Sequence, residues 1–339
     1  MTSESNTHHP FDAYFRDRRV CVTGGAGFIG GHLVERLLDL GAAVRVIDDL
    51  SNTNGEVIYR LIEDQPERAE FVHGSILDPD ALAAAVRGAD IVFHLAAIGS
   101  VPLSFEQPER TMEVNAIGSI RVAQAAVAAG VSRWVYSASS SAYGDNAALP
   151  KVESLVPEPM SPYAASKLAG EHIVTAWAHG FGLQGVSLRY FNIFGPRQSA
   201  DSAYAAVIAA FAATLRRGDH DNPPVIFGDG RQTRDFTHVD NAVHANLLAA
   251  TSRKRLDGQA VNVGCGRQIS ILDLYHRMAE LMGRTDMQPR MAAAREGDVR
   301  HSLADLTRAA DLLGYAPVRD FDDGLRETVA WFDDAAMRA

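Results

Sequence analysis

The chain has 339 residues, of which 47% are hydrophobic and 22% are charged, a composition typical of globular proteins. Its formal net charge of -10 argues against a binding surface for nucleic acid or for an anionic membrane. No run of about 18 apolar residues occurs, so we expect no membrane span. The two cysteines, Cys21 and Cys265, are not paired by their spacing, which favours a reduced, cytoplasmic setting.

The first part of the chain shows the pattern of a parallel sheet. Residues 1–18 are polar and are predicted to be a flexible lead-in. From residue 19 to residue 195, short β-rich runs alternate with helical patterns such as 29–40 and 115–130. The expected strands begin at Val20, Ala43, Glu70, Asp90, Trp134 and Val186. Nearly continuous apolar strands between helices predict an α/β fold, a Rossmann-type doubly wound parallel sheet.

The pattern changes after residue 195. A helical run at 205–217 and short strands from Pro224 and Ala260 are separated by polar loops. We expect residues 196–339 to form mainly a smaller, mixed α/β substrate lobe. In open α/β sheets, ligands bind outside the carboxyl ends of the strands, so this lobe should close over those ends.

A glycine-rich turn follows the first strand in the segment T-G-G-A-G-F-I-G. Gly24, Gly27 and Gly30 would permit a tight turn and a close approach of the backbone to a pyrophosphate at the helix N-terminus. Asp48 ends the second strand, where a carboxylate can accept both ribose hydroxyls and would repel a 2′-phosphate. The turn therefore predicts NAD rather than NADP as cofactor. A glycine-rich turn beside an exposed acid is the purely structural alternative.

The segment S-P-Y-A-A-S-K raises a second functional question. Pro162 suits the first turn of a helix capped by Ser161, and Tyr163 and Lys167 would then project from one face. An ordinary amphipathic helix with a solvated lysine has the same spacing. The strand from Trp134 runs into three serines, 139–141, whose hydroxyls either satisfy one another or bind a substrate.

Six motifs in order carry a resemblance to a known family: T-G-G-A-G-F-I-G, H-L-A-A, S-S-S-A-Y-G-D, Y-A-A-S-K, R-Y-F-N-I-F-G-P-R-Q and G-D-G-R-Q-T-R-D-F-T-H-V-D. Together they resemble the extended short-chain dehydrogenases/reductases, and among these the nucleotide-sugar epimerases typified by UDP-galactose and UDP-N-acetylglucosamine 4-epimerases. The resemblance covers nearly the whole chain after the lead-in. It implies NAD-dependent C4 epimerisation of a UDP-hexose through a transient 4-keto sugar.

The resemblance also implies roles for particular residues. Tyr163 would be the base that takes a sugar hydroxyl proton, made more acidic by Lys167 and by the positive nicotinamide, and Ser139 would bind the reacting oxygen. The implied cofactor-binding residues are Gly24, Gly27, Phe28, Ile29, Gly30, Asp48, Asn52, Ser75, Ile76, Leu95, Ala96, Ala97, Asn115, Tyr163 and Lys167. The implied substrate-binding residues are Ser139, Ser140, Ser141, Asn192, Arg234, Arg295, Asp298 and Ser302, and no metal site is expected.

Two positions bear on specificity. Ser302 stands where relatives have either a bulky tyrosine or a small residue that admits an N-acetyl group, which favours UDP-GlcNAc and UDP-GalNAc, with UDP-Glc and UDP-Gal as further substrates. Ser75 stands where many relatives carry an aspartate that contacts the adenine, which puts the affinity for NAD in doubt.

Other functions on the same scaffold stay open. Ser140 and Ser141 replace the Asp-Glu pair of the related 4,6-dehydratases, which disfavours elimination of water. A UDP-uronate epimerase or decarboxylase, a 4-keto reductase and a non-catalytic NAD-binding protein remain as alternatives. The family usually dimerises by pairing two helices from each subunit, here 105–130 and the helix that begins at Pro162, so we expect a homodimer.

Overall fold

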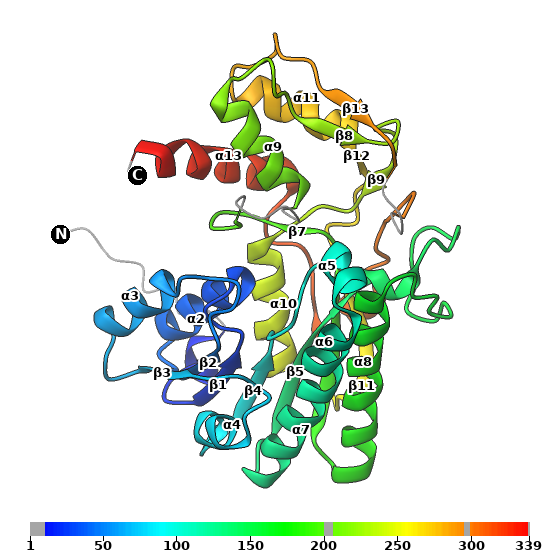
Figure 1. Cartoon of the computed structure of the whole chain (residues 1–339). Helices are drawn as coiled ribbons and strands as arrows, with labels where there is room; N and C mark the ends of the chain where they lie inside the picture. The colour runs from blue at the N-terminus through cyan, green and yellow to red at the C-terminus, as the bar shows by residue number, and fades with distance from the viewer. Residues whose placement is uncertain (1–10, 200–205, 295–298, 338–339) are drawn as a thin grey trace, which may run out of the picture.

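A seven-stranded, fully parallel sheet forms the body of the protein (Figure 1). The computed structural model describes residues 11–199, 206–294 and 299–337. The strand order is β3-β2-β1-β4-β5-β6-β11, which reverses direction between β1 and β4. The strands are β1 (Arg19–Thr23), β2 (Ala43–Asp48), β3 (Ala69–His73), β4 (Ile91–His94), β5 (Arg133–Ser139), β6 (Gln184–Tyr190) and β11 (Asp257–Val263). The predicted Rossmann-type fold is confirmed.

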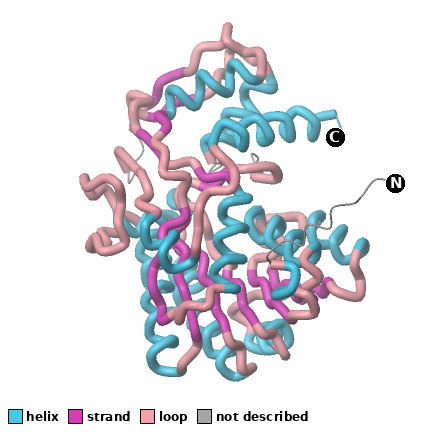
Figure 2. Tube along the Cα trace, turned by 180° about the vertical axis from the view of Figure 1, so that it is seen from behind, coloured by secondary structure: helices cyan, strands magenta, loops and turns pink. Residues whose placement is uncertain are grey.

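Helices cover both faces of the sheet, as its apolar strands require. One face packs against α4 (Pro79–Val86), α7 (Gly118–Ala128) and α8 (Pro162–Phe181), and the other against α2 (Phe28–Asp39), α10 (Val239–Thr251) and α12 (Thr307–Leu313). In β1, Val20 and Val22 belong to the core on the α2 side, whereas Cys21 belongs to the core on the α7 side. Figure 2 shows the strands side by side between these two helix layers.

A smaller lobe stands over the carboxyl ends of the strands, at the top of Figure 1. Its apolar core is separate from those of the sheet and includes Phe211, Leu274 and Phe321. The lobe contains α9 (Val207–Arg217), β8 (Val225–Phe227), β9 (Thr233–Arg234), β12 (Ile269–Ser270), α11 (Ile271–Leu281), β13 (Arg290–Ala292) and α13 (Phe321–Met337). The sheet domain also contains α3 (Glu56–Asp64), α5 (Val101–Glu106), α6 (Pro108–Met112), the π-helix η1 (Glu113–Ile117) and the 3-10 helix η2 (Ser140–Tyr143). Two short parallel strands, β7 (Ile193–Phe194) and β10 (Thr237–His238), pair with each other.

Two sequence-based expectations about the organisation need correction. The strand predicted to begin at Ala260 in the second lobe is part of β11, which pairs with β6 in the main sheet, and α10 and α12 pack on that sheet as well. The lead-in is not wholly flexible, because α1 (Asp12–Phe15) follows Phe11, and Phe11 and Phe15 are buried in the main core. Phe11 and Phe15, with Tyr14 packed against the same core, bury enough apolar surface to anchor this part of the segment.

The start of α8 agrees with the prediction and has a clear local cause. Ser161 lies in extended backbone and its Oγ accepts a hydrogen bond from the amide of Ala164 at 3.1 Å, while Pro162 occupies the first helical turn. Gly182 ends the helix with a φ of 71°, a left-handed conformation that glycine adopts without a Cβ clash. Within the described ranges, no helix is long and apolar enough to cross a bilayer.

Candidate active site

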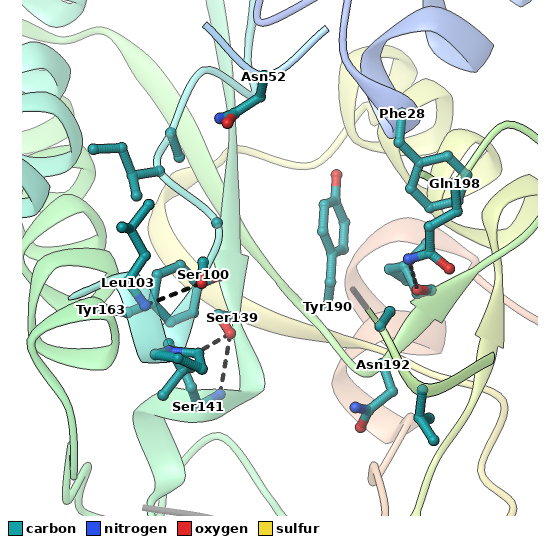
Figure 3. A pocket seen from close by; sticks show the side chains of 18 of the residues that line it. Phe28, Asn52, Ser100, Leu103, Ser139, Ser141, Tyr163, Tyr190, Asn192 and Gln198 are labelled. Carbon is teal, nitrogen blue, oxygen red and sulfur yellow. Dashed lines mark hydrogen bonds between the residues drawn. The ribbon is translucent and has the colours of Figure 1, made fainter. Parts of the chain in front are cut away.

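A large cavity of about 1870 Å³ lies between the carboxyl ends of the strands and the smaller lobe. The sheet domain contributes the glycine turn after β1, the end of β2 at Asp48 and the end of β5 at Ser139. The lobe contributes Arg234 and Ser302. In Figure 3, Ser139 and Tyr163 lie on one side of the cavity and Phe28 and Gln198 on the other, with Tyr190 between them. This placement matches the strand-end position at which open α/β sheets bind ligands.

The glycine turn has room for backbone only. A Cβ on Gly30 would lie 2.1 Å from the carbonyl oxygen of Gly24, and a Cβ on Gly24 would lie 2.5 Å from the amide nitrogen of Ala96. Gly24 also has a φ of 71°, which favours glycine. The first turn of α2 therefore meets the end of β1 closely, and its free N–H groups form the kind of cradle that binds a pyrophosphate.

Asp48 joins this turn to the end of β2. Its carboxylate accepts hydrogen bonds from the amides of Ala26 at 3.1 Å and Leu50 at 2.9 Å. Burial raises the pKa of Asp48 above its usual value, while the two amide hydrogen bonds lower it. A carboxylate has about four acceptor positions, so Asp48 retains acceptor capacity toward the cavity, which it lines.

Ser139 and Ser141 form a small hydroxyl network at the end of β5 (Figure 3). The Oγ of Ser139 accepts hydrogen bonds from the hydroxyl of Ser141 at 2.9 Å and from the amide of Ser141 at 3.2 Å. The proton of Ser139 is therefore available to a different acceptor, and a hydrogen bond with Ser139 acts to lower the pKa of Tyr163. The serine run thus presents one oriented donor to the tyrosine.

Tyr163 and Lys167 both line the cavity, but their pKa values differ from the simple expectation. Burial raises the pKa of Tyr163, and Ser139 is the group that acts against this rise. Burial lowers the pKa of Lys167 to about 7, while Glu171 raises it. The Lys167 ammonium lies 4.6 Å from the centre of the Tyr136 ring. Burial is thus the largest cause of both pKa shifts.

Comparison with known proteins identifies the family of the chain. Residues 20–264 match the NAD dependent epimerase/dehydratase family. The chain belongs to this family. It is 38% identical to the UDP-glucose 4-epimerase of Mycolicibacterium smegmatis over 93% of this chain and 98% of the relative. It is 30% identical to the UDP-N-acetyl-alpha-D-glucosaminuronate decarboxylase of Bacillus cytotoxicus, over 93% and 98% of the two chains.

A solved structure agrees with this membership. The UDP-N-acetylglucosamine 4-epimerase from Methanobrevibacter ruminantium in complex with UDP-N-acetylmuramic acid superposes with a TM-score of 0.87 at 37% identity. The match covers 94% of this chain and 99% of that chain. Members of the family use NAD, and the tight glycine turn together with Asp48 fits this cofactor.

The residues expected to bind the cofactor lie at the cavity with one exception. The cavity is lined by Gly24, Gly27, Phe28, Ile29, Gly30, Asp48, Asn52, Ser75, Ile76, Leu95, Ala96, Ala97, Tyr163 and Lys167. Asn115 does not line it. The side-chain amide of Asn115 exchanges hydrogen bonds with the backbone of Ile98 and donates to the hydroxyl of Ser166, and its contact with the cofactor stays a prediction.

Ser75 lines the cavity. Its Oγ accepts a hydrogen bond from the amide of Leu77 at 3.2 Å, which closes a local turn before α4. This turn uses part of the acceptor capacity of the hydroxyl. Ser75 consequently brings no charge to this end of the cavity.

The residues expected to bind substrate are placed as follows. Ser139, Ser140, Ser141, Asn192, Arg234 and Ser302 line the cavity. Arg234 is 9% exposed and Ser302 is 8% exposed, so both face the interior of the cleft. Arg295 and Asp298 lie outside the described residues.

The cavity wall also includes residues that the sequence reasoning did not single out, among them Lys151, Tyr190, Arg217 and Arg290. Tyr190 lies two residues before Asn192 in a motif that was recognised, so its position at the end of β6 was the available signal. Arg217 and Arg290 come from the end of α9 and from β13. No local pattern shows that these two elements face the sheet, because the packing of the lobe brings them there.

Proposed function

We propose that this protein interconverts the C4 epimers of a UDP-hexose, with UDP-GlcNAc and UDP-GalNAc as the preferred pair and UDP-Glc and UDP-Gal as a second pair. One observation carries the proposal. Ser139, Tyr163 and Lys167 come together in the same cavity as the glycine turn and Asp48. Membership of an NAD-dependent family that includes UDP-sugar 4-epimerases supports it.

The glycine turn and Asp48 would hold NAD, which would supply a reversible hydride acceptor for sugar C4. Ser139 is proposed to hold the C4 oxygen through its available proton, and Tyr163 to accept the hydroxyl proton as the carbonyl forms. Because burial raises the pKa of Tyr163, a positive charge near the phenol must favour its ionised form. Lys167, whose pKa near 7 keeps it partly protonated, and the nicotinamide are the proposed sources of that charge.

The substrate contacts are part of the same proposal. Asn192 and Arg234 are proposed to bind the diphosphate, since a guanidinium in a partly enclosed cleft forms strong hydrogen bonds to phosphate oxygens. Ser302 is proposed to leave room for an N-acetyl group, because its small side chain faces the cavity and is 8% exposed. Ser302→Tyr should therefore lower kcat/KM for UDP-GlcNAc by about tenfold or more while changing that for UDP-Glc less.

The direct test is to incubate the purified protein with UDP-GlcNAc and, separately, UDP-Glc, and to separate the C4 epimers. We expect interconversion without added reductant, since the cofactor is regenerated in each turnover. Tyr163→Phe should lose most turnover and still bind NAD. The proposal fails if no UDP-hexose is interconverted when NAD is supplied, and the base is wrongly assigned if Tyr163→Phe keeps full activity.

A UDP-hexuronate is the second candidate substrate. Lys151 is 1% exposed and lines the cavity, and such a cation can pair with the C6 carboxylate of a uronate. Its Nζ also donates a hydrogen bond to the carbonyl of Asn146. Incubation with UDP-glucuronate distinguishes the outcomes, since an epimerase yields UDP-galacturonate and a decarboxylase releases CO2.

We also propose that the protein is a cytoplasmic homodimer. Three side chains on the segment from α5 to the π-helix are exposed despite being apolar, namely Phe105 (47%), Met112 (38%) and Ile117 (45%). Burial of such a face against a second copy would stabilise the pair. Light scattering of Ile117→Glu, compared with the unchanged protein, tests this. Both cysteines are free thiols, as in a reducing compartment.

A further inference from the structure

A set of buried polar side chains runs beneath the cavity without lining it. Thr23 ends β1, His94 ends β4, Ser119 lies in α7 and Asn115 lies in the π-helix. Each of these side chains is at most 1% exposed. Hydrogen bonds join them into one chain that begins at Ala96 on the cofactor side and ends at the first turn of α8.

The first half of the chain of hydrogen bonds joins the amide of Ala96 to the imidazole of His94. The amide of Ala96 donates to the Thr23 hydroxyl oxygen at 3.2 Å. The Thr23 proton is then available for the Nδ1 of His94, 2.7 Å away. The Thr23 oxygen can accept a second hydrogen bond, so the contacts of the other ring nitrogen decide where the proton of His94 lies.

The second half fixes the other ring nitrogen. The Ser119 hydroxyl donates to the carbonyl oxygen of Asn115 at 2.6 Å, since a carbonyl can only accept. The Nε2 of His94 lies 2.9 Å from the same Ser119 oxygen and must therefore be its donor. Neutral His94 with its proton on Nε2 satisfies both contacts. A second proton, on Nδ1, would prevent Nδ1 from accepting the hydrogen bond of the Thr23 hydroxyl.

The surroundings of His94 keep it in this neutral form. Its ring packs against Trp134 and Tyr136, with ring centres 6.1 and 5.5 Å apart. Burial and the nearby charge of Lys167 lower the pKa of His94 to about 3.

Asn115 passes the chain on to the catalytic helix. Its Nδ2 donates to the hydroxyl of Ser166 at 2.9 Å, and Ser166 donates to the carbonyl oxygen of Tyr163 at 2.8 Å. Its Oδ1 accepts from the amide of Ile98 at 2.8 Å, which ties the loop after β4 to the same point. Two surfaces that must face each other for hydride and proton transfer thus share one buried support.

We propose that neutral His94 is a positioning residue with two separable halves. Its Nδ1 contact with Thr23 holds Ala96 and the adjacent glycine turn for NAD, and its Nε2 contact with Ser119 holds Asn115 and the first turn of α8 that carries Tyr163. This inference rests on the proposed function for its catalytic half.

Two substitutions at position 94 separate the halves. The amide of His94→Asn reaches only the Nδ1 position, so it retains an acceptor for Thr23 and loses Ser119. The amide of His94→Gln reaches the Nε2 position, so it retains a donor to Ser119. Ser119→Ala cuts the second half without changing the imidazole. Ser187→Ala is the matched control. Like Ser119, Ser187 is fully buried, but it lies in β6, outside both the chain of hydrogen bonds and the cavity.

Three measurements read the two halves independently: kcat, the NAD dissociation constant by calorimetry, and amide hydrogen exchange in the first turn of α8. His94→Asn and Ser119→Ala should lower kcat by about tenfold to a hundredfold and speed exchange of that turn, with a small change in NAD affinity. His94→Gln should have a kcat about tenfold above that of His94→Asn and an NAD dissociation constant raised about fivefold. Ser187→Ala should change none of the three.

The decisive result is that His94→Asn mainly loses kcat whereas His94→Gln mainly loses NAD affinity. A purely structural role for His94 predicts that both variants lose kcat and NAD affinity by the same factors, in step with their stability, and that result would overturn the proposal. Unchanged kcat and unchanged exchange in Ser119→Ala would overturn it as well. If the unchanged protein turned over no UDP-sugar, the proposed function would fail, while NAD affinity and hydrogen exchange would still decide the role of His94.

Discussion

Glu171 binds the guanidinium of Arg189 through two hydrogen bonds, of 2.9 and 2.7 Å, one helical turn beyond Lys167. Both side chains of the ion pair are buried. Burial lowers the pKa of the Lys167 ammonium to about 7, and the charge of Glu171 offsets only part of this effect. The site therefore contains a lysine that can lose its proton near neutral pH.

This lowered pKa gives Lys167→Met a pH-dependent effect on stability. Between about pH 7 and 10.5, the unfolded chain binds a proton at Lys167 that the folded chain does not, so the free energy of unfolding rises with pH. The slope should be about 1 kcal/mol per pH unit near neutrality. Lys167→Met lacks this contribution.

Urea denaturation of both proteins from pH 6 to pH 9 checks the prediction. Lys167→Met should gain most over the unchanged protein at pH 6, where the buried ammonium is charged, and the gap should narrow as the pH rises above 7. Parallel stability curves for the two proteins would show that Lys167 does not titrate in this range.

Ser141→Ala should lower kcat by about tenfold, less than Ser139→Ala, for which we expect about a hundredfold to a thousandfold loss. The hydroxyl of Ser141 donates to the Ser139 oxygen and so turns the Ser139 proton toward Tyr163 and the substrate. After the substitution, the amide of Ser141 still donates to the same oxygen and preserves part of the orientation. Steady-state kinetics of the two variants give the comparison, and equal losses would contradict the orienting role.

The sequence predicted the parts of the fold that depend on local patterns. The strand beginning at Ala43 ends at Asp48 as expected, because an apolar run is bounded by Gly41 and by the acid. The helix at Pro162 begins where its proline and capping serine indicate. The glycine turn, Asp48 and Tyr163 then meet in one cavity because parallel strands end at the same edge of the sheet.

What the sequence could not show depends on contacts between distant segments. The strand β11 pairs with β6, although much of the smaller lobe lies between them in the sequence, and no local pattern encodes this pairing. Asn115 occupies a recognisable motif position, yet its amide is hydrogen-bonded to Ile98 and Ser166, which lie 17 and 51 residues away in the chain. The raised pKa of Tyr163 reflects burial, which motif spacing does not report.

Asp235→Asn should raise the KM for the UDP-sugar by about tenfold and leave NAD affinity nearly unchanged. The carboxylate of Asp235 accepts hydrogen bonds from the backbone amides of Cys265, Gly266 and Ala304 at 2.8 to 3.1 Å. These hydrogen bonds fix the backbone beside Ser302. An asparagine presents an NH2 group to at least one of these donors. The glycine turn lies on other elements and should be unaffected.

Asp286→Asn is the matched control for Asp235→Asn, because its carboxylate is 66% exposed and pairs only weakly with His220 at the surface. Kinetics and calorimetry on both variants separate the effects. If NAD affinity fell as much as substrate affinity in Asp235→Asn, Asp235 would support the whole fold rather than the substrate side.

Gly30→Ala should weaken NAD binding, whereas Gly180→Ala should stabilise the fold, although each places one methyl group on a helix. A Cβ at Gly30 would meet the Gly24 carbonyl oxygen at 2.1 Å and the Gly25 Cα at 2.8 Å, and neither backbone atom can move without opening the turn. Such overpacking costs about 1–3 kcal/mol, so NAD affinity should fall roughly 5- to 150-fold. A Cβ at Gly180 in α8 meets nothing within 4 Å, so alanine should raise stability by about 0.5–1 kcal/mol. Calorimetric NAD titration and thermal unfolding of both variants provide the measurement, and retained NAD affinity in Gly30→Ala would show that the cofactor does not rest on this turn.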